Sequence, residues 1–144
     1  MFERKDMPIG NFYFSVEIDG IQEGNFLKAS GVASEVEVEE YEEGGVNHFT
    51  HKIPVRIKHS NIVLEKGVTS SKELLKWFSQ IQEGIIIKKN FSIILWNQGK
   101  EIVRRWNFYN GYPVKWEAGE LDALGTSILV ERIEITHEGM KEST

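Results

Sequence analysis

The sequence predicts a mainly β fold, a barrel or a sandwich of about eight strands with one flanking α-helix over about residues 71–82. Apolar and polar residues alternate with a period of two along much of the chain, which is typical of half-buried strands. Turn residues such as Asp19-Gly20 and Asn97-Gln-Gly99 separate these segments. Only one segment has helical spacing. The pattern therefore indicates one β-rich unit with a single helix.

Length and composition agree with one domain over residues 11–144, preceded by a polar N-terminal arm at residues 1–10. With 40% hydrophobic and 27% charged residues, the 144-residue chain can bury a core and is not expected to be disordered. The net charge of −5 disfavours nucleic acid as a general partner, because phosphate binding needs a clustered basic face. The absence of cysteine excludes disulfides and thiolate chemistry.

The N-terminal residues have no apolar core of the kind found in a signal peptide. We therefore expect the chain to be made in the cytoplasm without a leader. Its apolar runs, such as residues 85–87, are far too short to span a bilayer, so no membrane anchoring is expected.

The first predicted strand is the most regular. Its apolar residues share one face of a period-2 pattern and are expected in the core: Phe12, Phe14, Val16 and Ile18. A short strand or bend follows at residues 26–29. Residues 33–41 alternate again, with carboxylates on one face and Val36 and Val38 on the other. Residues 55–59 and 61–65 complete the strands of this half.

The predicted helix begins at a capping box, in which the Ser70 hydroxyl and the Glu73 carboxylate would each accept a backbone N–H of the other residue. Apolar side chains then recur at helical spacing, and Gly84 is a natural helix end. We expect Trp77 and Phe78 to pack the helix against the barrel, since burying such rings stabilises a fold by a few kcal/mol.

The second half returns to strands. Residues 91–96 and 101–109 are predicted to form a hairpin. Asn110-Gly111 is predicted to break the chain before a strand at residues 112–117. A loop over residues 118–125 then leads to a last strand over residues 127–137.

Three carboxylates, Glu35, Glu37 and Glu39, share one strand face at a spacing of about 7 Å. Like charges this close need water or basic partners, so a dry core is excluded for this face. Three placements are open: a solvated outer face, the lining of an aqueous channel with Val36 and Val38 packed on the core, or an interface that pairs with Arg56 and Lys58.

Several segments together resemble the tail tube proteins of contractile phages and related injection systems. The resemblance covers residues 11–140. It lies in the opening strand, in Tyr41-Glu-Glu-Gly-Gly45, in Gly67-Val-Thr before the helix, in Gly111-Tyr-Pro-Val-Lys-Trp-Glu117 and in His137-Glu-Gly139. No single segment is decisive, but their order and spacing make chance similarity improbable.

The resemblance implies a β-barrel subunit with one flanking helix, similar to the tube subunit of type VI secretion. Copies of the chain would form homohexameric rings that stack into a hollow tube inside a contractile sheath, with baseplate or initiator and terminator proteins at its ends. Cargo or DNA would pass along the lumen without specific binding. The particle would be a virion tail or an extracellular or cytoplasmic injection device.

The resemblance also suggests which residues make contacts between copies. The family's extended loop reaches adjacent subunits, and the matching inter-subunit residues are Glu42, Glu43, Gly44, Gly45, Val46, Asn47 and His48. Gly44 and Gly45 permit unusual backbone angles there, although an ordinary hairpin tip is the alternative. Met1, Phe2 and Met7 of the N-terminal arm are inter-ring candidates, with a disordered tail as the alternative. Glu35, Glu37 and Glu39 are the lumen-facing candidates.

Signals for chemistry are weak. His48 and His51 lack a third ligand at a standard spacing, so no metal site is expected. Arg104 and Arg105 lie on opposite strand faces, which favours a salt-bridging surface beside core aromatics over a stacking patch for single strands. Nothing orients a base toward a nucleophile, so neither an enzyme nor a cofactor is expected. The alternative function is a monomeric small-molecule-binding β-barrel.

Overall fold

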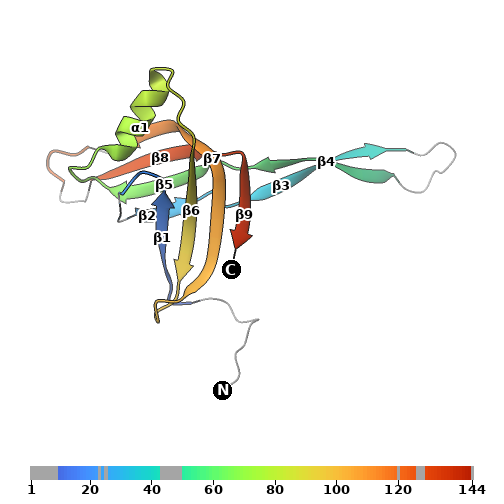
Figure 1. The fold of residues 1–144 in the computed structure, drawn as a ribbon, viewed down its shortest axis with the longest axis horizontal. Coiled ribbons are helices and arrows are strands. Elements are labelled where there is room, and N and C mark those ends of the chain that lie inside the picture. The colour runs from blue at the N-terminus through green and yellow to red at the C-terminus, as the bar shows by residue number, and fades with distance from the viewer. Residues whose placement is uncertain are drawn as a thin grey trace.

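The computed structural model describes residues 10–22, 24, 26–42, 50–119, 121–125 and 129–143. Within them the chain forms nine strands and one helix, which confirms the mainly β fold with a single flanking helix (Figure 1). The elements are β1 Tyr13–Ile18, β2 Phe26–Ser30, β3 Ser34–Tyr41, β4 His51–His59, β5 Ile62–Gly67, α1 Glu73–Gln82, β6 Lys89–Trp96, β7 Ile102–Ala118, β8 Val130–Thr136 and β9 Gly139–Ser143.

Seven strands form one antiparallel sheet in the order β1-β6-β7-β8-β5-β2, and β9 pairs with β7 beside this path. The long strand β7 divides the sheet into two halves. Its first part pairs with β6 and β9, and its second part pairs with β8. The first half-sheet (β1, β6, the first part of β7, and β9) runs at a steep angle to the second half-sheet (the second part of β7, β8, β5 and β2) (Figure 1). The two halves therefore fold around one core.

The predicted break at Asn110-Gly111 is wrong, because β7 bends there and continues through both residues. Asn110 has a φ of 54°, and its backbone N–H donates to Oδ1 of Asn90. A Cβ on Gly111 would lie 2.7 Å from Cε1 of Phe91. The two residues thus provide a left-handed conformation and a close approach, which turn the strand from one half-sheet to the other without ending it.

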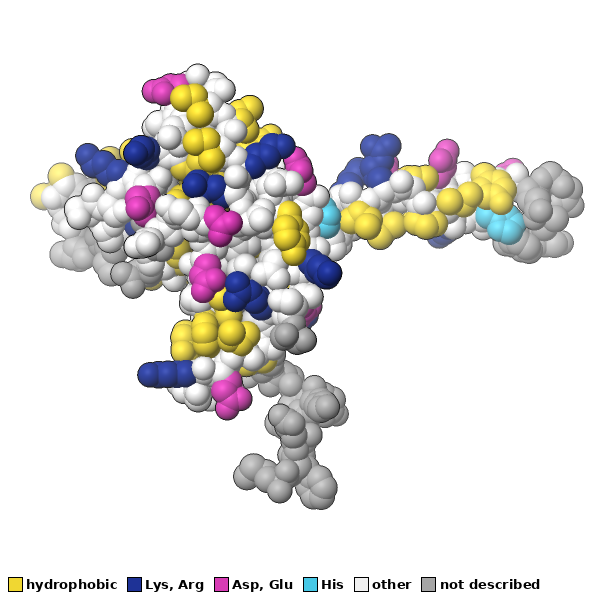
Figure 2. Space-filling view, viewed as in Figure 1, with side chains coloured by type: hydrophobic (Ala, Val, Ile, Leu, Met, Phe, Trp, Pro, Cys, Tyr) yellow, Lys and Arg dark blue, Asp and Glu magenta, His cyan; other side chains and the backbone are white. Residues whose placement is uncertain are grey.

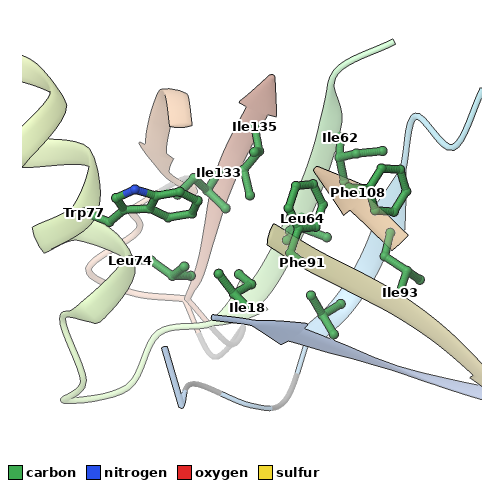
Figure 3. Close-up of a cluster of buried hydrophobic side chains, with 11 residues drawn as sticks. Ile18, Ile62, Leu64, Leu74, Trp77, Phe91, Ile93, Phe108, Ile133 and Ile135 are labelled. Carbon is green, nitrogen blue, oxygen red and sulfur yellow. The ribbon is translucent and has the colours of Figure 1, made fainter. Parts of the chain in front are cut away.

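The core draws on both half-sheets and on the helix (Figure 3). Its rings include Phe91 and Phe108, which stack with centroids 4.7 Å apart. Helix α1 contributes Leu74 and Trp77, and the indole N–H of Trp77 donates to the carbonyl of Ile87 at 2.8 Å. The full set is Val16, Ile18, Ile62, Leu64, Leu74, Trp77, Phe91, Ile93, Phe108, Ile133 and Ile135. Aromatic and branched side chains therefore fill the space between the half-sheets.

The start of the helix differs from the predicted capping box. The N-cap is Lys72, whose side chain makes no capping hydrogen bond, so the N-cap role predicted for Ser70 is wrong. The carboxylate of Glu73 instead accepts the backbone N–H of Gln22 at 2.8 Å. The Glu73 carboxylate therefore makes a tertiary contact with the segment after β1 in place of the predicted capping bond.

The end of the helix confirms the role predicted for Gly84. This residue has a φ of 85°, which a glycine adopts without steric cost. Its N–H donates to the carbonyl of Ile81, and the N–H of Ile85 donates to that of Gln80. These two bonds form a Schellman motif that satisfies carbonyls of the last turn.

The C-terminal strands also differ from the prediction. Strand β8 begins at Val130, whereas the predicted strand began at residue 127, which lies outside the described residues. Strand β9 was not predicted at all, because its residues are polar and show no apolar alternation. It forms by pairing with β7, where Arg104 makes an ion pair with Glu142.

Candidate functional site

A two-stranded arm projects from the body of the molecule (Figure 1). Strands β3 and β4 pair with each other, and in the described part of the chain they pair with no other strand. A ribbon of this length extends over about 26 Å. An isolated two-stranded ribbon is marginally stable in water, so this arm is expected to gain stability from a further surface.

In the half of the arm nearest the body one face is apolar and exposed, whereas Glu40 and Lys52 lie on the same face toward the far end. Val36 lies opposite Ile57, and Val38 lies opposite Pro54 across a bulge. Val36 and Val38 are each 51% exposed and Ile57 is 64% exposed, so the expectation that the two valines pack on the core of their own chain is wrong. Hydrophobic side chains follow the arm in Figure 2. Contiguous exposed apolar surface of this kind marks an interaction site.

Sequence reasoning missed Ile57, together with Val55, as part of this face. The signal was present, because residues 55–59 repeat the period-2 alternation of residues 33–41. The sequence did not show what packs on this face. In the described part of the chain nearly all residues of β3 and β4 are exposed, and alternation alone does not distinguish such a ribbon from a strand with one buried face.

The opposite face of the arm carries the charged residues. Glu35 lies across from Lys58, and Glu37 from Arg56. Nε of Arg56 lies 2.9 Å from Oε2 of Glu37, and Nζ of Lys58 lies 3.7 Å from the same oxygen. The pairing with Arg56 and Lys58 that the sequence left open is therefore made within the chain. Exposed pairs of this kind contribute little stability, so the charges serve mainly to keep this face hydrated.

The far end of the arm carries Tyr41 and His51, whose rings stack with centroids 5.1 Å apart. Glu42, the first residue of the predicted inter-subunit loop, is exposed. The rest of that predicted set lies outside the described residues: Glu43, Gly44, Gly45, Val46, Asn47 and His48. The inter-ring candidates Met1, Phe2 and Met7 lie outside them as well.

The strands at the ends of the seven-stranded sheet each have an edge without a partner within the described chain. Strands β1 and β9 lie at the two sides of the first half-sheet, and β2 ends the second. An open edge presents a row of backbone N–H and C=O groups that can pair with another chain. The first half-sheet is therefore open on both sides.

The outward face of the first half-sheet is polar. Arg105 lies at its centre, where Nη2 donates to Oε2 of Glu17 at 3.2 Å and Nε donates to Oδ1 of Asn107 at 3.1 Å. Ser92 donates to the same Oδ1, and Asn107 donates to the hydroxyl of Ser143. The network spans β1, β6, β7 and β9, so most polar groups of this face are satisfied before any partner arrives.

Arg104, on the other face of β7, makes an ion pair with Glu142. The hydrogen bond from Arg104 holds the pKa of the Glu142 carboxyl below its usual range. Trp106 packs against the core and Phe108 is fully buried. These contacts confirm the salt-bridging surface with core aromatics that was favoured over a stacking patch.

The predicted core-packing residues differ in their placement. Trp77 is 2% exposed, Phe78 is half-buried, and Phe14 packs against the core. Phe12 is 51% exposed, so its predicted place in the core is wrong. It precedes the first residue of β1 and lies outside the pairing with β6.

Two cavities lie beside the core of the fold. One of about 300 Å³ is lined by polar groups, among them Glu17, Asp19 and Arg105. Another of about 250 Å³ lies between the helix and β7, beside Leu75 and Trp116. In the part of the chain that the structure describes, no group of three or more metal-binding side chains occurs. No helix there has the length and apolar character to cross a membrane.

Comparison with known proteins gives a consistent result. A chain of the PVC sheath–tube complex of an extracellular contractile injection system, in the extended state, is 28% identical, with a TM-score of 0.83 over 96% of this chain and 93% of that one. A chain of the anti-feeding prophage cap is 28% identical, with a TM-score of 0.85 over 100% and 96%. Hcp1 from Flavobacterium johnsoniae shares the fold, with 18% identity and a TM-score of 0.61 over 90% and 93%.

A search of curated protein sequences finds no match. The family model of the T4-like virus tail tube protein gp19, however, matches residues 10–141. This match covers nearly the whole chain and includes the arm, the open sheet edges and the helix. The chain belongs to the gp19 tail tube protein family.

Proposed function

We propose that this subunit builds the inner tube of a contractile injection machine, and that the arm and the open edges of the first half-sheet make the contacts between copies. The observation that supports this most is the arm, whose apolar face is exposed in the single chain. Because the chain belongs to a family of tube proteins, the natural partner for this face is a second copy of the same chain.

The contact is heterologous, since the arm of one copy would cover a different surface on the next. Heterologous contacts form rings when the rotation closes. The resemblance to tube proteins implies six copies per ring. Pairing the β1 edge of one copy with the β9 edge of the next would join the first half-sheets into one closed sheet, which leaves no free edge and gives a stiff wall.

The lumen-facing residues are a further part of the proposal. Glu35, Glu37 and Glu39 are exposed or half-buried on the charged face of the arm. Carboxylates that line an aqueous channel would repel anionic cargo and let it pass without binding. The polar network around Arg105 supports a second polar surface at the same wall, because its groups are already hydrogen-bonded within the chain.

The partners follow from the relatives that are 28% identical. Their structures are of a sheath–tube complex, a tube-terminating cap and a sheath/tube terminator. We infer that this chain also meets a sheath outside the tube and initiator and terminator proteins at its ends. The loop at residues 42–48 and the N-terminal residues Met1, Phe2 and Met7 are proposed to contact the same ring and the next ring, respectively.

Size-exclusion chromatography with negative-stain electron microscopy tests the proposal. Rings or tubes of constant diameter are expected, either from the chain alone or after addition of its baseplate initiator. A compact monomer that persists with the initiator present, and that binds a small molecule, would support the alternative of a monomeric binding barrel and overturn the tube.

A further inference from the structure

Two exposed apolar patches lie at opposite ends of the first half-sheet (Figure 2). The helix patch is residues 85–87, three isoleucines between α1 and β6 that are between 37% and 60% exposed. The turn patch lies near the β6–β7 turn and consists of Phe12, Tyr13 and Ile102, which are 51%, 45% and 48% exposed. Clusters of large apolar side chains in solvent are typical of a surface that binds a partner.

The helix patch is held in place by the residues around it. The indole N–H of Trp77 donates to the carbonyl of Ile87 at 2.8 Å, which fixes the end of the segment to the buried face of α1. The next residue, Lys88, makes an ion pair with Glu138 beside β9. The backbone of residues 85–87 is therefore ordered while the isoleucine side chains remain in solvent, so a partner that covers them has little backbone entropy to remove.

The turn patch is also ordered within the single chain. Tyr13 lies opposite Trp96 on β6, and Trp96 lies opposite Ile102 on β7, so these side chains form a row across three strands. The rings of Tyr13 and Trp96 stack with centroids 6.2 Å apart. The side chain of Gln98 in the turn donates to the carbonyl of Asn11 at 2.9 Å, which ties the segment before β1 to the turn. The row therefore presents a fixed aromatic and aliphatic surface.

The two patches of one chain are too far apart to touch each other. They are separated by the eight residues of β6, which extend over about 26 Å. In the proposed ring the β1 and β9 edges of neighbouring copies pair side by side, so the ends of the strands form the two rims of the ring. The helix patch then lies on one rim and the turn patch on the other.

We propose that the helix patch of each copy docks on the turn patch of a copy in the next ring, and that this contact stacks the rings head to tail. The contact is heterologous, since it joins two different surfaces, and such a contact repeats without limit along an axis. Head-to-head stacking would join like patches and end after two rings. This inference rests on the proposed function, because the rims exist only in a closed ring.

The small size of the patches sets the order of assembly. Each patch contains only three side chains, far less than the roughly 1,000 Å² of buried surface that a specific protein–protein interface needs. One such contact does not hold two free chains together. In a closed ring all copies present their patches at once, and linked contacts bind far more tightly than any one of them. Stacking through the patches therefore follows ring closure.

Chemical cross-linking of the full chain tests which surfaces meet. The chain has no cysteine, so Ile86→Cys with Ile102→Cys places one unique thiol in each patch. A short bismaleimide is expected to link assembled tubes into covalent series of three or more copies, and to link no copies in the unassembled chain. With either cysteine alone, no product larger than a dimer is expected. Tubes of the doubly substituted chain that give no product larger than a dimer would overturn the contact.

Substitutions separate this contact from the tube role itself. Ile86→Glu and, in a second variant, Ile102→Glu are expected to leave single rings of normal diameter and to abolish tubes in electron micrographs. Leu27→Glu, on β2 and 51% exposed, is the matched control and is expected to form tubes. Circular dichroism checks that each chain folds. Normal tubes from the first two variants, or folded chains of either that form no rings, would overturn the contact and leave the proposed function standing. A wild-type chain that forms neither rings nor tubes would overturn both.

Discussion

Nζ of Lys66 lies 3.1 Å from Oε1 of Glu131, and these side chains are only 2% and 9% exposed. The two residues face each other across β5 and β8 at one end of the core. Trp116 donates its indole N–H to the other carboxylate oxygen at 2.9 Å, and Lys66 also donates to the carbonyl of Gly67. Each member of this buried pair forms a further hydrogen bond, and these bonds offset the free-energy cost of removing the two charges from water.

Removal of one partner from this pair is expected to be costly. Glu131→Gln keeps an acceptor for Trp116 but removes the negative charge that lies 3.1 Å from the Lys66 ammonium, and a loss of about 3–5 kcal/mol in unfolding free energy is expected. Urea unfolding of the unassembled chain measures it. The double variant Glu131→Gln with Lys66→Met removes both charges and is expected to recover most of the loss. A double variant as unstable as Glu131→Gln would contradict this account.

The bend of β7 depends on the small size of Gly111. Its Cβ position lies 2.7 Å from Phe91 and 3.1 Å from Ile135, both in the core. Gly111→Ala is therefore expected to destabilise the chain by about 1–3 kcal/mol through overpacking. Gly139→Ala is the matched control, since nothing lies within 4 Å of its Cβ position. Thermal unfolding compares the two, and equal effects would show that the close approach is not what matters.

The apolar face of the arm is expected to be needed for assembly and not for folding. Val36→Lys with Ile57→Glu places opposite charges across the two strands on side chains that are exposed in the single chain, so stability is expected to change by less than about 0.5 kcal/mol per site. Tube growth is expected to stop. Lys58→Gln on the opposite face serves as control and is expected to allow growth. Electron microscopy and circular dichroism give the two readouts, and normal tubes from the doubly substituted chain would exclude this face from the contact.

Acid is expected to weaken the fold through its exposed ion pairs. The hydrogen bond from Arg132 holds the pKa of the Glu117 carboxyl below its usual value of 4.5, and Lys88 acts in the same way on Glu138. The unfolded chain therefore binds protons first, so this stabilisation is present above pH 4.5 and is lost as the pH falls through the lower folded values. Unfolding free energies measured from neutral to acidic pH are expected to fall less steeply for Glu117→Gln than for the control Glu101→Gln.

The lumen proposal makes a prediction about cargo. Glu35→Lys with Glu37→Lys reverses two charges on one arm face, and assembled tubes are then expected to slow or retain anionic cargo. Release of a fluorescent anionic polymer from filled tubes measures the effect. Since Glu37 pairs with Arg56, circular dichroism must first show that the arm remains folded. Unchanged release would place this face on the outside of the wall.

Much of the fold could be predicted from local sequence patterns. The alternation in β1 and the turn residues after β6 predicted their strands, and Gly84 predicted the end of the helix, because each depends on neighbouring residues along the chain. The family could be inferred from the order of these segments, and the match over residues 10–141 confirms it.

Only the tertiary structure decided what each pattern means in space. The alternation in β3 looked like a strand with one buried face, but no part of the body that the structure describes covers the arm there, so Val36 is exposed. Asn110-Gly111 looked like a break, but a core ring lying against Gly111 makes it a bend. Strand β9 is polar and forms because β7 has a free edge. Burial and pairing depend on residues far apart in the sequence, and local periodicity carries no information about which distant surface is available.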